Sequence, residues 1–109
     1  MRVCVITTVH PPNDIRISKE LDTLVKAGYD VVYIAQKGKF DNDKVTFWPL
    51  TVYHDRIKRL IKGSREAFGK ALEANADIYH FHDPELIGLG KKLKRHGKKV
   101  VYDIHEEYP

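Results

Sequence analysis

The chain has 109 residues, which suits one small domain at the usual size of roughly 100–200 residues. Its 42% hydrophobic and 31% charged residues suit a packed core under a soluble surface, and no run approaches the roughly 18 apolar residues of a membrane-spanning helix. The single cysteine, Cys4, excludes an internal disulfide framework and favours a reducing, cytoplasmic setting. The start of the chain does not have the pattern of a secretory signal. The net charge of +4 is compatible with anionic partners but requires none.

The first half of the chain predicts a strand, a helix and a second strand. The apolar run within residues 1–7 is typical of a strand buried on both faces. A loop with two prolines follows, and then apolar residues recur at helical spacing until Gly28, where a helix end is expected. Residues 31–35 form the second buried strand, so this unit is a right-handed crossover between parallel strands.

The second half continues the alternation. A weaker strand at 45–50, interrupted by Pro49, precedes an amphipathic helix at 56–72. A strand at 78–81, a helix that runs from the Asp83 cap to Gly97, and a last strand at 99–104 follow. The apolar face expected for the long helix contains Ile57, Leu60, Ile61, Phe68, Ala71 and Leu72.

This order of elements predicts the α/β class, with a doubly wound, mainly parallel, Rossmann-like sheet and helices on both faces. Residues 1–109 are expected to form a single domain. Each new strand of such a sheet needs a covering helix, and none follows the last strand. We therefore expect a truncated domain, the front portion of a larger protein.

Three histidines follow the strand ends of this predicted sheet. Ligands of doubly wound sheets bind beyond the carboxyl ends of the strands, near the point where the strand order reverses. The strand at the start of the chain leads into His10, the strand at 78–81 into His82, and the last strand into His105. We expect these residues and nearby carboxylates to converge on one rim, which is the candidate site.

The strand at 78–81 carries several of the candidates. His80 and His82 are two residues apart and share a face, with His80 expected to be the deeper, hydrogen-bonded residue and His82 the better ligand contact. Asp83 before a proline is most often a helix cap, although its second oxygen could accept a substrate hydroxyl. Glu85 is a further substrate-binding candidate, and the helix dipole alone would also favour it.

His105 is the strongest candidate for a catalytic residue. It lies just past a strand end, beside Glu106 and Glu107. A histidine there can donate a hydrogen bond to a sugar hydroxyl or a phosphate oxygen, and the carboxylates would bias its protonation. Glu106 is accordingly a substrate-binding candidate.

The loop after the first strand lacks the glycines of dinucleotide-binding proteins, since Pro11 and Pro12 stand there. This argues against a simple NAD-binding module. Polar side chains of the loop still suit substrate binding, and Arg16 could fork onto a phosphate or be a solvated helix residue. The substrate-binding candidates here are His10, Asn13, Asp14 and Arg16.

Two alternative chemistries have weaker support. His80, His82 and Asp83 resemble the start of some metal-hydrolase motifs, but the further ligands are missing, so we expect no metal site. The cations of residues 56–70 and 91–99 could contact an anionic membrane surface, although a solvated helix face is the commoner role of such runs. No nucleic-acid recognition motif is present, so nucleic-acid binding is not expected.

The chain resembles the N-terminal domain of the family 4 retaining glycosyltransferases, which have two facing Rossmann-like domains in the GT-B fold. The resemblance covers most of the chain and lies in "RVCVITTVHPPNDIRISKELDTLVKAGYDVVYIA" and "ADIYHFHDPELIGLGKKLKRHGKKVVYDIHEEYP". The pieces "HFHDPEL" and "YDIHEEYP" are specific together. The loop after the first strand departs from the family, because many members have paired glycines there.

The resemblance implies transfer of a sugar from a nucleotide-sugar donor to an acceptor hydroxyl with retention, in glycan, polysaccharide or glycolipid synthesis. The donor would be held mainly by a C-terminal domain that is absent here, so this portion alone would be inactive. His105 would contact the transferred sugar, and no cofactor or catalytic metal is implied. The implied localisation is cytoplasmic, with peripheral contact at the inner membrane face left open.

Two other functions remain open from the sequence. A stand-alone α/β binding module would have the same elements without a partner domain. A metal-dependent hydrolase would use His80, His82 and Asp83. The donor sugar, the acceptor and the oligomeric state have no signature in these residues.

Overall fold

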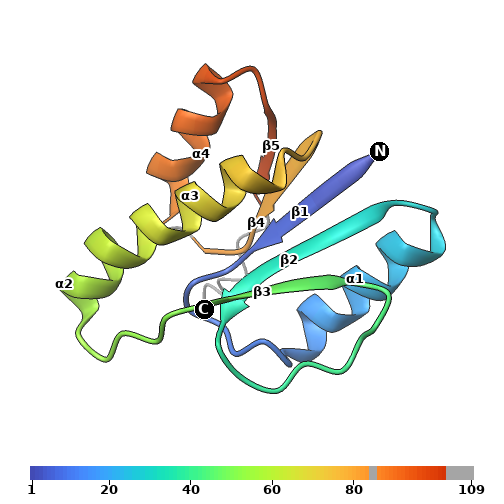
Figure 1. The fold of residues 1–109 in the computed structure, drawn as a ribbon, viewed down its shortest axis with the longest axis horizontal. Helices are drawn as coiled ribbons and strands as arrows, with labels where there is room; N and C mark the ends of the chain where they lie inside the picture. Colours follow the sequence, from blue (N-terminus) through green and yellow to red (C-terminus); the bar gives the residue numbers. More distant parts are fainter. Residues whose placement is uncertain (84–85, 103–109) are drawn as a thin grey trace, which may run out of the picture.

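The computed structural model describes residues 1–83 and 86–102, and these form one five-stranded parallel sheet with helices on both faces (Figure 1). The sheet order is β3-β2-β1-β4-β5, so the strand order reverses between β1 and β4. This confirms the predicted α/β, doubly wound, Rossmann-like class. The strands are β1 (Arg2–Ile6), β2 (Asp30–Gln36), β3 (Thr46–Leu50), β4 (Ile78–Phe81) and β5 (Lys99–Tyr102).

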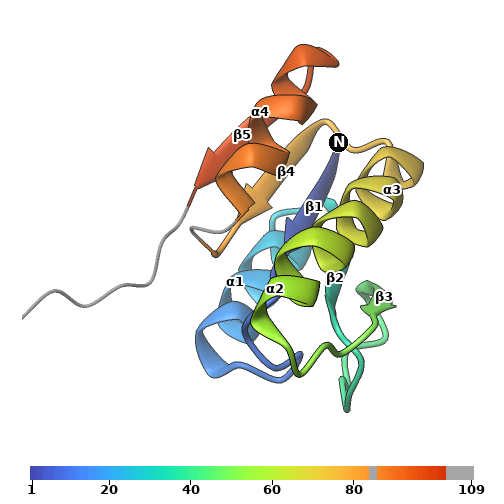
Figure 2. The same cartoon turned by 90° about the vertical axis from the view of Figure 1, so that its left-hand side faces the viewer.

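One helix covers one face of the sheet, and the other helices cover the opposite face (Figure 2). Helix α1 (Ile15–Lys26) packs Ile17 and Leu21 against β1 and β2. Helices α3 (Ser64–Ala74) and α4 (Ile87–Arg95) pack on the other face over Ile6, Tyr79 and Phe81. Apolar side chains on both faces explain why the central strands read as continuous hydrophobic runs.

The strand registers bring the predicted rim together. Val5 pairs with His80 and Ile6 with Phe81, so the segments that follow β1 and β4 leave the sheet side by side. At the β3 edge, Pro49 pairs with Ala35 of β2. An edge strand tolerates proline because its outer side forms no ladder. The predicted neighbourhood of β1 and β4 at the reversal point is therefore confirmed.

The long amphipathic helix differs from the prediction. It runs from α2 (Arg56–Lys58) through a π-helix, η1 (Arg59–Gly63), into α3. The buried residues of α3 are small, namely Ala67, Ala71 and Ala74, and they let the helix lie close to the sheet. Of the predicted apolar face only Ala71 is buried. Phe68 is half-buried, and the exposed members are Ile57, Leu60, Ile61 and Leu72.

The two ends of α1 follow the expected chemistry. Asp14 caps α1 by accepting a hydrogen bond from the Ile17 amide, and Gly28 follows that helix with a φ of 90°, which favours glycine. Helix α4 begins at Ile87 with Leu86 as its N-cap and no side-chain cap bond. Residues 84 and 85, where the predicted Asp83 cap would act, lie outside the described residues, so that cap stays a prediction. Within the described ranges, no helix is both long and apolar enough to cross a membrane.

Candidate functional site

The loop after β1 folds around the carboxylate of Asp83, which is only 1% exposed. The Thr7 hydroxyl donates to its oxygens at 3.0 Å, and the Thr8 hydroxyl donates at 3.1 Å. The backbone amides of Thr8 and Val9 donate to the same Oδ2 atom. The Asp83 side chain therefore fixes the conformation of this loop.

The far side of the same loop is held by the end of β2. The Gln36 side-chain amide donates to the Thr8 carbonyl at 2.8 Å, and the Tyr33 hydroxyl donates to the Pro12 carbonyl at 3.2 Å. Burial, followed by the negative charges of Asp14, Asp83 and Glu20, raises the pKa of Tyr33 well above its usual value. Tyr33 therefore keeps its proton and acts as a donor to the loop.

His10 lies between two carboxylates at the rim. Its Nε2 atom is 3.4 Å from Asp83 Oδ1, and its Nδ1 atom is 3.7 Å from Asp14 Oδ2. The His10 amide also donates to the Thr7 hydroxyl at 3.2 Å, which fixes the backbone beneath the ring. The side chain is 27% exposed, so a histidine that two carboxylates orient is also accessible to a ligand.

His80 and His82 lie under α1 and share one carboxylate. Their rings stack at 4.8 Å with 11° between the planes, which confirms that they share a face of the sheet. Glu20 of α1 contacts His80 Nδ1 at 2.7 Å and His82 Nε2 at 3.3 Å. The expected order of depth is wrong, because the His82 side chain is fully buried whereas that of His80 is 18% exposed.

The charge of Glu20 is stabilised by this pair. Burial alone would raise the pKa of Glu20, but hydrogen bonds from His80 and His82 and the charges of the two rings lower it to about 2. Glu20 is thus an anion at any physiological pH, and it ties α1 to the end of β4.

The same three residues offer ligand atoms for a metal ion, all within 4.8 Å of one another. A ligating imidazole holds its metal in the ring plane, along the nitrogen lone pair. Rings only 11° from parallel do not share such a position, so this arrangement fits a hydrogen-bonded network better than a coordination site. Asp83 is not part of the group, so the three residues of the hydrolase alternative are not brought together.

The other predicted residues are placed as follows. Asn13 is exposed and lines a cavity of about 310 Å³ with residues of α1 and of the segment 39–42, away from His10. Arg16 is exposed in the first turn of α1, next to the Asp14 cap. Glu85, His105 and Glu106 lie outside the described residues. Substrate contacts by the predicted residues therefore stay predictions.

Besides Tyr33 and Gln36, three further residues that hold the site were not predicted. Thr7 and Thr8 are buried polar residues at the end of an apolar strand, and this pattern is a usable signal of a bonded loop. Glu20 looked like one residue of a solvated helix face. Its partners are 60 and 62 positions away, so no local spacing indicated them.

No protein-family model matches the chain, and no curated protein matches it. Among solved structures, the fold is similar to sucrose-phosphate synthase from Thermosynechococcus elongatus, with a TM-score of 0.72 and 12% sequence identity. The match covers 96% of this chain and 33% of that chain. The chain therefore spans about a third of the synthase that it matches, and at this identity the likeness is one of fold.

Proposed function

We propose that this chain is the N-terminal, acceptor-side portion of a retaining glycosyltransferase that uses a nucleotide-sugar donor. The observation that carries the proposal is the fold, which matches a third of sucrose-phosphate synthase over 96% of this chain. The resemblance of "HFHDPEL" and "YDIHEEYP" to family 4 glycosyltransferases supports it independently. A second α/β domain would supply most of the donor site.

In this proposal the reaction takes place beyond the carboxyl ends of β1 and β4. The bond between the anomeric carbon and the diphosphate oxygen breaks, and a bond from that carbon to the acceptor oxygen forms. The proton of the acceptor hydroxyl passes to the oxygen of the leaving diphosphate, and nucleoside diphosphate is released. Among the rim histidines that the structure describes, His10 is partly exposed and lies against two carboxylates, so it would bind the acceptor or donor oxygens. Asp83 would be a positioning residue, because its oxygens hold the loop that carries His10.

His105 takes the role that the resemblance implies, and the other predicted residues keep the roles that their sequence positions indicate. His105 would contact the transferred sugar and stabilise charge that develops at it, in the manner of a preorganised polar group. Glu106, Glu85 and Arg16 would line the same cleft, and no cofactor is required. His82 is buried against Glu20, so it would support the rim from below.

The test is transfer by the product of the complete reading frame. The protein is incubated with a panel of nucleotide sugars and a cell-derived glycan and glycolipid fraction, and the release of nucleoside diphosphate is measured. We expect release with one donor and an anomeric configuration, read by NMR, that matches the donor. The absence of a second α/β domain from the frame, or no release with any donor, would contradict the proposal and favour a stand-alone binding module.

A further inference from the structure

The outer surface of the helix from Arg56 to Arg65 exposes large apolar side chains. Ile57 is 66% exposed, Ile61 is 53% exposed and Leu60 is 37% exposed, although all three lie on a helix of a packed domain. The π-helix and the close approach of the alanine face of α3 to the sheet leave them facing solvent. Exposed apolar clusters of this kind mark interaction surfaces.

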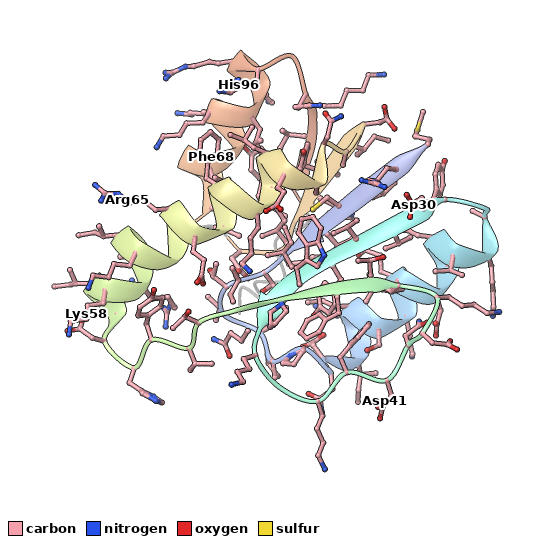
Figure 3. All side chains as sticks on the ribbon, in the orientation of Figure 1. Asp30, Asp41, Lys58, Arg65, Phe68 and His96 are labelled. Atoms are coloured by element: carbon pink, nitrogen blue, oxygen red, sulfur yellow. The ribbon has the colours of Figure 1, made fainter. Side chains whose placement is uncertain are left out.

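The same stretch is strongly cationic. Residues 56–65 contain five arginines and lysines and no acidic residue: Arg56, Lys58, Arg59, Lys62 and Arg65. Lys58 and Arg65 project from the outer side of the helix, away from the sheet (Figure 3). The first acidic residue that follows, Glu66, is bound to the backbone amide and hydroxyl of Thr51, so it faces the domain.

A groove continues this surface toward α4. Its volume is about 300 Å³, and its lining combines Leu60, Ile61 and Leu89 with the cations Arg65 and Lys92. The Lys92 ammonium lies 5.5 Å from the centre of the Phe68 ring, which holds α3 and α4 together at this groove. Beside it, Ile87 is 40% exposed at the start of α4.

We infer that this surface, made of α2, η1 and the groove beside α4, binds the face of an anionic lipid bilayer. Apolar side chains enter the boundary between headgroups and acyl chains, while the surrounding cations contact lipid phosphates. Charge complementarity selects an anionic surface, and the aliphatic centre distinguishes a bilayer from a nucleic acid, which would use cations without isoleucines. The inference does not depend on the proposed transferase activity.

The test is co-sedimentation of the full chain with vesicles of phosphatidylglycerol and phosphatidylcholine in equal parts, and with vesicles of phosphatidylcholine alone. We expect binding to the anionic vesicles that weakens as salt is raised, and at least about tenfold weaker binding to the neutral ones. Equal binding to both compositions, or no binding to either, would overturn the inference.

Matched variants separate insertion from simple attraction of charge. Ile57→Ser with Ile61→Ser should weaken binding about tenfold or more, whereas Ile15→Ser, at a 75% exposed isoleucine of α1, should leave it unchanged. Lys58→Gln with Lys62→Gln should weaken binding, and Lys26→Gln with Lys44→Gln should not. If the isoleucine pair has no effect, or if each control matches its test variant, the inference is wrong. Circular dichroism confirms that each variant is folded.

Discussion

Asp83 holds the centre of the candidate site. Its carboxylate is buried and accepts hydrogen bonds from two hydroxyls and two backbone amides of the loop after β1. All of these partners are hydrogen-bond donors, so position 83 needs a side chain that accepts hydrogen bonds through two oxygens. An amide at this position would turn two hydrogens toward donors and leave buried groups unsatisfied.

We therefore expect Asp83→Asn to lower the free energy of unfolding by about 2–3 kcal/mol. Urea denaturation followed by circular dichroism measures the change. Asp43→Asn, at an exposed aspartate of the β2–β3 connection, is the matched control and should change stability by less than about 0.5 kcal/mol. Equal effects of the two substitutions would show that Asp83 does not hold the loop.

Glu20 gives stability that depends on pH. Its folded-state pKa is about 2, below the ordinary value of 4.5, so its charged form stabilises the fold above pH 4.5 and that stabilisation is lost as the pH falls toward 2. Glu20→Gln should lower the free energy of unfolding by about 1–2 kcal/mol at pH 6. The difference from the wild type should shrink between pH 5 and pH 2.

Urea denaturation at each pH measures this difference. Glu73→Gln, at an exposed residue of α3, is the control and should show no such trend. A Glu20→Gln deficit that is the same at pH 6 and pH 2 would show that the carboxylate charge does not act through His80 and His82.

The sequence predicts the shared face of His80 and His82 but not the depth of each side chain. Strand alternation correctly put His80 and His82 on one face, because side chains two apart on a strand point the same way. Their depth was predicted in the wrong order, because burial depends on the helix that covers the strand end. Glu20, which meets both rings, is far away in the sequence.

Periodicity located the helices, but it gave the wrong buried face for the long helix at 56–72. The amphipathic pattern at 56–72 correctly indicated a helix, yet the π-helix η1 changes the register of side chains between α2 and α3. The sheet then receives Ala67 and Ala71 rather than Ile57 and Ile61. A single π-helical turn does not change the spacing of apolar residues in the sequence, so the sequence could not predict it.

Helix α4 offers a sharp test of packing between elements. A Cβ atom at Gly90 would lie 2.0 Å from the Tyr102 hydroxyl of β5 and 2.8 Å from its ring carbon Cζ, whereas a Cβ at Gly88 would meet nothing within 4 Å. Gly90→Ala should lower the free energy of unfolding by about 1–3 kcal/mol because the tyrosine must move. Gly88→Ala should raise it by about 0.5–1 kcal/mol through helix propensity alone.

Thermal and urea unfolding of the two variants provide the comparison. Both substitutions place alanine in the same helix, so propensity acts equally on them and the contact with Tyr102 is the difference. Similar stabilities for Gly88→Ala and Gly90→Ala would mean that Tyr102 does not pack against α4 as described.

At the scale of the whole molecule, the topology followed from the sequence. Apolar strands alternate with amphipathic helices, and right-handed crossovers leave few ways to order such strands in one sheet. The β3-β2-β1-β4-β5 order and its match to part of sucrose-phosphate synthase agree with that prediction. The rim beyond β1 and β4 could be located from the sequence because strand ends converge there in this class, while its use as a binding site stays a prediction.

The roles within that rim were less predictable. His10 and Asp14 were expected there and lie beside one another, and Asp83 joins them from β4. The oxygens of Asp83 accept hydrogen bonds from Thr7, Thr8 and backbone amides of the loop. These contacts exist only once the sheet has formed, so the sequence did not indicate them. His105, Glu106 and Glu85 lie outside the described residues, so their roles stay predictions.

If the rim beyond β1 and β4 serves a glycosyltransferase, as proposed, sugar transfer by the product of the complete reading frame should depend on His10, and the His10→Gln variant measures that dependence. We predict a fall in kcat/KM of about a hundredfold relative to wild type, with folding unchanged and Lys44→Gln as active as the wild type. A His10→Gln protein that transfers sugar at the wild-type rate would contradict the account.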